Sequence, residues 1–273
     1  MEAPTPSRAE RLFHLGADAT SRTFQLPDDG SRWYVCPLCL LGFSEDDIGT
    51  DLTEEHVPPK SVGGAVLLLT CRSCNNSAGH TIDAAIADRD HIESFAQGIS
   101  GTAEYTGRAR LKLGDAEVTV DVETGPNGVR LNVVRGRTGP TDLEALRAAF
   151  DAAVEAGTSD GLAFTLTPRR RVHTRQASIG DLKSAYLLAF TKFGYKYGTS
   201  AALSVVREQI DSPESKVVDH FFFPMPDHDR EGMILVTSEP CVALLVMLPD
   251  RAVLLPFPFD GGPEDPYGQI ASL

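Results

Sequence analysis

The sequence of 273 residues has few basic side chains: 25 Lys and Arg stand against 38 Asp and Glu, for a formal net charge of −13. This balance excludes a broad electrostatic grip on nucleic-acid phosphates and leaves a local grip, or one that a partner supplies. Long hydrophobic runs are also missing, since the longest apolar stretch, CVALLVMLPDRAVLLPF, is broken by Pro, Asp and Arg. The N-terminal sequence MEAPTPSRAERLFHLG lacks the apolar segment of a signal peptide. We therefore expect a cytoplasmic protein with no membrane partner.

Cysteine is scarce, but four of the five cysteines form two Cys-x-x-Cys pairs, Cys36 with Cys39 and Cys71 with Cys74. Each pair can direct two sulfur atoms at one ion, and two pairs complete a tetrahedral thiolate site. A redox motif would need only one pair. The pattern therefore predicts a structural Zn²⁺ in a reducing compartment, with no open coordination position for chemistry. Cys241 lies in an apolar, strand-like run and is interpreted as a core thiol.

Hydrophobic periodicity predicts an α+β protein: a small zinc-bound module followed by a larger α+β domain with a mostly antiparallel sheet. Helical patterns appear near residues 7–15, 75–95, 140–157, 178–198 and 200–211, and alternating patterns fill much of 104–138 and 220–258. The predicted division is an N-terminal extension (1–30), the zinc module (31–96) and an α+β domain of unknown role (97–273). The aromatic residues of SAYLLAFTKFGYKYG are expected in the core rather than stacked on bases.

The segment between the two cysteine pairs carries the candidate chemistry. Glu55 and His56 precede a Pro-Pro and Gly-Gly turn, and Asn75, Asn76 and His80 follow the second pair at the start of a predicted helix. Neutral imidazole suits a general base, and carboxylate, amide and imidazole groups can ligate a divalent ion. The local order is expected to be strand, turn, strand, helix. The alternative is that these side chains only cap turns and helix ends.

Taken together, Cys-x-x-Cys, Glu-His-x-x-Pro, Ser-x-Gly-Gly and CNNSAGHTID resemble the HNH endonuclease family with its ββα-metal fold, over about residues 33–90. The resemblance implies His56 as the general base and Glu55 as a metal ligand, in the place where Asp is usual. It implies Asn75 as the second ligand, with Asn76 and His80 as alternatives. It further implies double-stranded DNA as the substrate, although RNA is not separable from sequence. The ion would be Mg²⁺ or Mn²⁺.

The sequence also departs from the family pattern. The stretch Val66–Thr70 lacks the Asn that orients the catalytic His in many members, so another group must orient His56. Asp83 fits a helix N-terminal turn better than a metal site.

The zinc module is itself acidic, with four Lys or Arg against ten Asp or Glu in residues 31–93. The best candidate for contacts with phosphate is the group Arg169, Arg170, Arg171 and Arg175. A protein partner or activator, and a homo-oligomer, stay open.

The sequence therefore predicts a metal-dependent endonuclease that hydrolyses phosphodiester bonds. The competing hypothesis is a catalytically inactive HNH-like zinc module that serves as a protein-interaction scaffold.

Overall fold

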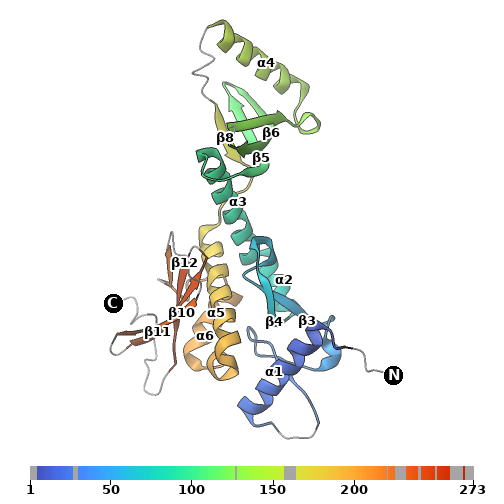
Figure 1. The fold of residues 1–273 in the computed structure, drawn as a ribbon, viewed down its shortest axis with the longest axis vertical. Coiled ribbons are helices and arrows are strands. Elements are labelled where there is room, and N and C mark those ends of the chain that lie inside the picture. Colours follow the sequence, from blue (N-terminus) through green and yellow to red (C-terminus); the bar gives the residue numbers. More distant parts are fainter. Residues whose placement is uncertain are drawn as a thin grey trace. The chain divides into compact units, whose positions relative to one another are not determined.

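A computed structural model describes residues 5–26, 30–126, 128–156, 164–219, 221–224, 232–238, 241–249, 251–258 and 267. The chain divides into two compact units. The first comprises residues 1–87 and 173–273, and the second comprises residues 88–172. Each is described by itself. Mixed helices and antiparallel sheets confirm the α+β class (Figure 1). No helix in the described ranges is long and apolar enough to cross a membrane.

The first unit opens with helix α1 (Arg8–Phe24). The Ser7 side chain accepts a hydrogen bond from the backbone of Glu10, and Glu10 accepts one from Ser7, so both ends of a capping box are present. The helix buries Phe13 and Ala17 against the strands that follow, in a cluster with Tyr34, Leu52 and Leu69.

The predicted order of strand, turn, strand and helix is confirmed. The elements are β1 (Tyr34–Val35), β2 (Gly42–Phe43), 3-10 turns at Glu45–Asp47 and Lys60–Val62, β3 (Leu52–Val57), β4 (Ala65–Cys71) and α2 (Arg72–His80). The β3–β4 turn depends on two glycines. Gly63 has a φ of 87°, and a Cβ at Gly64 would lie 1.5 Å from the Pro58 carbonyl oxygen. Helix α2 begins directly after β4, which brings the second cysteine pair to the base of the hairpin.

The region predicted as one helix over residues 75–95 contains two. Helix α2 ends at His80, and α3 (Ile82–Ser100) follows after Thr81, whose φ of −117° and ψ of −85° are not helical. The Thr81 hydroxyl donates to the Ser77 carbonyl. A side chain that bonds the backbone in this way competes with helix continuation. The periodicity did not reveal the break because apolar spacing continues across it.

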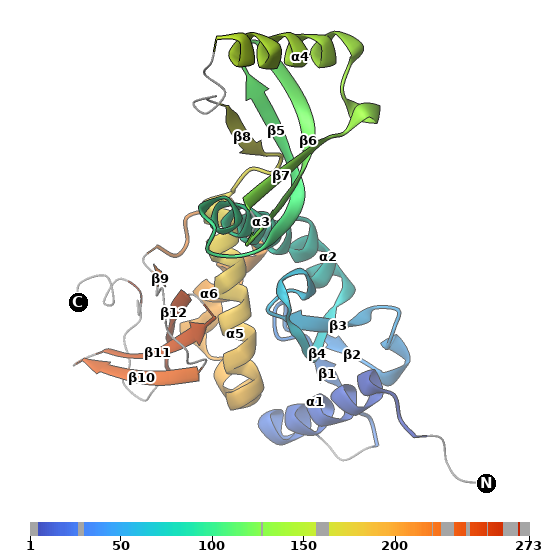
Figure 2. The same cartoon turned by 45° about the horizontal axis from the view of Figure 1, so that its top comes forward.

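Helix α5 (Thr174–Gly198) is the central element of the first unit. It packs against β3 and α1 on one side and against the C-terminal sheet on the other. It therefore lies between the part of the unit that carries the four cysteines and that sheet (Figures 1 and 2). The sheet has the antiparallel order β10-β11-β12-β9. The other elements are 3-10 turn Ala201–Leu203, α6 (Ser204–Asp211), β9 (Phe222–Pro224), β10 (Gly232–Ser238), β11 (Cys241–Leu248) and β12 (Arg251–Pro256).

The aromatic side chains of α5 confirm the core interpretation. Tyr186, Phe190, Tyr195 and Tyr197 are buried, while Phe193 is partly exposed. All three tyrosines also donate hydrogen bonds to backbone carbonyl groups: Tyr197 to that of Pro256, and Tyr186 and Tyr195 to carbonyls beside the first cysteine pair. The side chain of Cys241, interpreted as a core thiol, lies outside the described part of the structure.

The second unit is an antiparallel sheet of order β7-β6-β5-β8 with one long helix, α4, beside β6. Its elements are β5 (Tyr105–Leu113), β6 (Ala116–Gly125), β7 (Gly128–Val133), 3-10 turn Arg135–Arg137, α4 (Pro140–Glu155) and β8 (Thr165–Pro168). Alternating burial along β5 and β6 forms the core around Ala109, Val120 and Val122.

These compact units differ from the predicted division into residues 31–96 and 97–273. Residues 173–273 group with residues 1–87, and the second unit is an insertion between them. The physical reason is α5. A helix that is buried on nearly every side must be covered on more than one side. Helix α5 is covered by the part of the unit that carries the four cysteines and by the C-terminal sheet.

Candidate functional site

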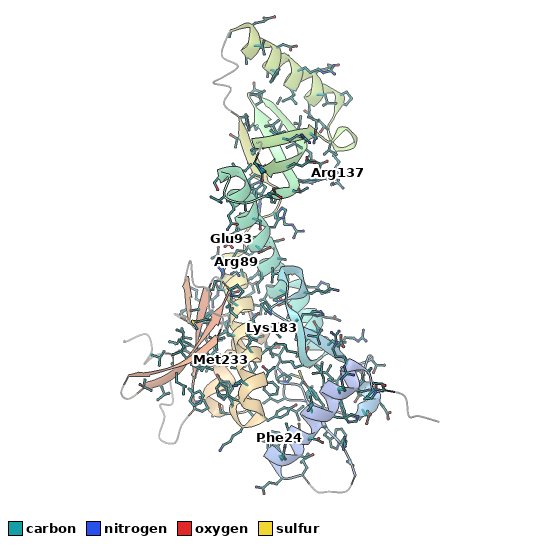
Figure 3. The ribbon with its side chains drawn as sticks, in the orientation of Figure 1. Phe24, Arg89, Glu93, Arg137, Lys183 and Met233 are labelled. Carbon is teal, nitrogen blue, oxygen red and sulfur yellow. The ribbon has the colours of Figure 1, made fainter. Side chains whose placement is uncertain are left out.

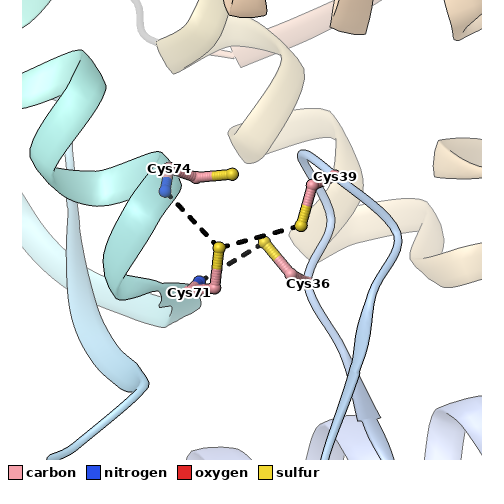
Figure 4. A group of neighbouring side chains, drawn as sticks. All are labelled: Cys36, Cys39, Cys71 and Cys74. Atoms are coloured by element: carbon pink, nitrogen blue, oxygen red, sulfur yellow. Dashed lines mark hydrogen bonds between the residues drawn. The ribbon is translucent and has the colours of Figure 1, made fainter.

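The four cysteines of the two pairs come together at the base of the hairpins. Their Sγ atoms all lie within 4.8 Å of one another, and this is the only cluster of metal-ligand type found among the described residues (Figure 4). Cys36 is fully buried, whereas Cys39 is exposed. The backbone N–H groups of Cys71 and Cys74 donate to the sulfur atoms of Cys36 and Cys71, each at 3.4 Å. Such donors stabilise thiolate charge.

The spacing of the sulfur atoms fits zinc. A tetrahedral ion with Zn–S bonds of about 2.3 Å separates its sulfurs by roughly 3.8 Å, and the Sγ atoms of Cys39 and Cys71 are 3.7 Å apart. The hydrogen bond from Cys36 lowers the pKa of Cys39 and Cys71, so these two thiols lose their protons readily. The donor set, four sulfurs without an additional ligand, fits a closed structural site.

Helix α5 braces this site through tyrosine hydroxyls. Tyr186 donates to the Pro37 carbonyl at 2.7 Å, and Tyr195 donates to the Val35 carbonyl at 2.7 Å. Both contacts hold the first cysteine turn in place. Burial raises the pKa of Tyr186 and Tyr195 to about 12, so both hydroxyls keep their protons and remain donors.

A β-bulge between Glu55 and His56 shapes the segment predicted to be catalytic. Glu55 pairs with Leu68 on β4, whereas His56 pairs with Val66, so Leu67 is the additional residue. A bulge changes the direction of neighbouring side chains and often lies beside an active site. Glu55 is buried and His56 is partly exposed. His56 is therefore accessible at the end of a strand that the cysteine site anchors.

Glu54 is the acidic neighbour of His56. Two hydrogen bonds from Arg8, together with the charge of His56, hold the pKa of Glu54 below its usual range. Within the described ranges no hydrogen bond to the His56 ring is found. His56 interacts with Glu54 through charge, and the Asn of the family pattern is missing from β4.

The carboxylate of Glu55 is occupied by protein groups. Its Oε1 lies 2.7 Å from the ammonium nitrogen of Lys183, and its Oε2 accepts a 2.8 Å hydrogen bond from the Thr70 hydroxyl. Lys183 also lies 2.8 Å from Asp83 Oδ2. As placed, Glu55 does not fit a divalent-ion site, because the ammonium group takes the position of the cation.

The three candidate ligands on α2 differ in their surroundings. The amide nitrogen of Asn75 donates to the Thr53 hydroxyl at 2.9 Å and to the Glu54 carbonyl at 3.3 Å, which leaves its carbonyl oxygen as the ligating atom. Asn76 and His80 are exposed. Asn75 is thus held against β3, beside the predicted catalytic segment.

The family model for HNH endonucleases matches residues 36–91. Residues 36–91 are thus similar to HNH endonucleases, and this segment is called the HNH module below. The match begins at the first cysteine and ends within α3, so it covers the cysteine site, the β3–β4 hairpin and α2. No curated protein and no solved structure matches the chain.

The arginines predicted to contact phosphate differ in their surroundings. Arg175 belongs to the first unit, where it donates to the Ser215 carbonyl and the Gln209 side chain. Arg170, in the second unit, forms an ion pair with Asp88. Arg169 and Arg171 are exposed. Arg170 is exposed as well, so the second unit carries three exposed arginines of this set, and Arg175 is partly exposed in the first unit.

Sequence reasoning missed Lys183. The signal was its position within SIGDLKSAYLLAF, where a charged residue stands among residues that must be buried. A buried ammonium needs acidic partners, and the HNH module offers an excess of them. Asp83 does lie in the first turn of α3, as the sequence predicts, but it also pairs with Lys183.

Proposed function

We propose that the HNH module hydrolyses phosphodiester bonds in nucleic acid, with His56 as the general base. The single observation that supports this most strongly is the family match over residues 36–91, joined to a hairpin that ends in a partly exposed His56. Neutral imidazole takes a proton from water, and the neighbouring Glu54 carboxylate stabilises the imidazolium that forms. The cysteine site holds the hairpin rigid but has no open position for catalysis.

The proposed substrate is double-stranded DNA, and the proposed divalent ion is Mg²⁺ or Mn²⁺. Glu55 and Asn75 are the proposed ligands for this ion, with Asn76 and His80 as alternatives. Because Lys183 holds Glu55 in the described conformation, no step through the ion is derived. Arg169, Arg170, Arg171 and Arg175 are the proposed contacts to phosphate. With a net charge of −13, the protein is expected to bind DNA weakly unless a partner delivers it.

The test is cleavage of supercoiled plasmid by the zinc-loaded full chain with Mg²⁺, Mn²⁺ or Ni²⁺ at low salt. We expect nicking by the wild type and a loss of at least about 100-fold in His56→Ala, the usual contribution of a general base. His14→Ala is the matched control, since His14 is a partly exposed histidine paired with Glu45 on the surface. Equal cutting by His56→Ala and the wild type would show that the activity has another origin. An RNA substrate in parallel reactions decides between the two nucleic acids.

One observation favours the second candidate function, a catalytically inactive zinc module that serves as a protein-interaction scaffold. Glu55, the expected ligand, is already neutralised by Lys183. If the wild type cleaves neither DNA nor RNA while it keeps its zinc, this second function is favoured.

A further inference from the structure

Lys183 reaches into the HNH module from outside it. The residue lies on α5 (Figure 3), beyond the matched range 36–91. Its ammonium nitrogen nevertheless lies between the carboxylates of Glu55 and Asp83 of the module. The side chain of Lys183 is only 2% exposed, and that of Glu55 only 3%. This is a buried ion cluster with two carboxylates and one ammonium.

A close helix approach makes this reach feasible. A Cβ on Gly180 would lie 2.8 Å from the Ile82 carbonyl oxygen and 2.6 Å from the Ile86 side chain. The absence of a side chain at Gly180 therefore lets α5 lie directly against the start of α3. Asp83, in the first turn of α3, and Lys183, one turn after Gly180, are thereby brought together.

The two carboxylates retain capacity for a cation. Their two negative charges exceed the single charge of Lys183, and Asp83 Oδ1 is buried with no hydrogen-bond partner among the described residues. An orphaned carboxylate oxygen beside a second carboxylate is a donor set that Mg²⁺ and Mn²⁺ favour. Asn75, on α2, is bonded to the same hairpin: its amide donates to the hydroxyl of Thr53, which pairs with Thr70, the donor to Glu55.

Lys183 itself is unsuited to hold a nucleic-acid phosphate. It is almost fully buried and its charge is directed at two acidic groups, so it would have to leave both to meet a phosphate. Burial by itself would lower the pKa of Lys183, but Glu55 and Asp83 outweigh this effect and raise it. The ammonium group of Lys183 fills the place of a cation between the two carboxylates.

We propose that Lys183 and a divalent cation compete for Glu55 and Asp83, so that α5 controls the loading of the ion site. A divalent ion binds these carboxylates only when the Lys183 side chain has withdrawn. The inference builds on the proposed function in assigning this ion to the HNH reaction, but the competition is a property of binding and is measured without activity.

The test is Mn²⁺ binding to the zinc-loaded full chain, followed by electron paramagnetic resonance of the unbound ion. We expect Lys183→Met to bind Mn²⁺ at least tenfold more tightly than the wild type, and Glu55→Gln added to this variant to remove the gain. Lys192→Met is the matched control, because Lys192 is an exposed lysine on the same helix. It should leave the Mn²⁺ affinity unchanged.

Lys183→Gln repeats the comparison with a polar side chain, in case Lys183→Met does not fold. The proposal is overturned if either folded variant binds Mn²⁺ no more tightly than the wild type. The wild type provides a test that needs no substitution at Lys183: tight Mn²⁺ binding that Glu55→Gln abolishes would also overturn it. If His56→Ala cleaved plasmid as well as the wild type does, only the proposed hydrolysis by His56 would be refuted. The competition between Lys183 and Mn²⁺ is measured by binding and does not depend on that assay.

Discussion

Removal of the Lys183 charge should destabilise the first unit strongly. Lys183→Met keeps the length and apolar stem of the side chain but leaves Glu55 and Asp83 buried without a cation. Breaking a buried ion pair by removing one partner costs about 3–5 kcal/mol. The lower end, about 3 kcal/mol, is expected here because the Asp83 side chain is 13% exposed and water can solvate it in part.

A double-mutant cycle separates the free energy of the Lys183–Glu55 interaction from the effect of each substitution on side-chain packing. Glu55→Gln alone leaves Lys183 with Asp83 and should cost about 1–3 kcal/mol, the effect of disturbing one buried polar contact. In the double variant, only Asp83 loses its partner. The two substitutions should therefore be less than additive, with a coupling of at least about 1 kcal/mol.

The assay is urea denaturation at fixed zinc concentration, followed by tryptophan fluorescence. Trp33 is the only tryptophan of the chain and lies in the first unit, so the signal reports that unit rather than the second. The reasoning would be refuted if Lys183→Met lowered the free energy of unfolding by less than about 1 kcal/mol, or if the two substitutions were strictly additive. Either result would mean that the charges of Lys183 and Glu55 do not stabilise one another.

Two further predictions concern the cysteine site and the second unit. Cys71→Ser should abolish binding of one zinc per chain, measured by mass spectrometry, and remove the cooperative Trp33 transition, because the energy of a structural zinc site is folding energy. Cys241→Ser, which leaves the cluster intact, should keep the zinc. Burial, together with the charge of Arg170, lowers the pKa of His91. A base with a lowered folded-state pKa loses stability as the pH falls below its unfolded value of about 6.5. The protection factors of the β5 amides, which correct for the intrinsic exchange rate, should therefore fall below that pH in the wild type but not in His91→Gln, by less than about 1 kcal/mol because the ring is partly exposed.

Much of the fold followed from periodicity and turn residues. The strand–turn–strand–helix order between the cysteine pairs was predicted because Pro, Gly and the Cys-x-x-Cys turns determine local geometry over a few residues. The long helix α5 was predicted from its apolar spacing. The grouping of residues 173–273 with the N-terminal part was not, because single-sequence periodicity shows that α5 is apolar on many sides but not which elements cover those sides.

In the candidate site, too, the sequence predicted the local features but not those that depend on tertiary packing. The spacing of the four cysteines predicted that they form one cluster, because the geometry of a Cys-x-x-Cys turn depends only on residues adjacent in sequence. The environment of Glu55 depends instead on Lys183, which lies more than a hundred positions away along the chain. Nothing local to Glu55-His56 indicates a buried ammonium. Only the tertiary approach of α5 at Gly180 creates the contact.

The acidity of the HNH module has a structural explanation in this arrangement. Residues 31–93 carry ten Asp or Glu against four Lys or Arg, which is unfavourable for meeting a polyanion. Lys183 neutralises one of these charges inside the module, and Arg8 neutralises the charge of Glu54 from α1. Both cations come from outside residues 36–91, so the charge that a nucleic acid would meet at His56 is set by α1 and α5 as well as by the module. An isolated fragment of residues 31–96 would lack both contacts, and His56 would then stand among uncompensated carboxylates. The electrostatics around His56 are therefore a property of the whole first unit.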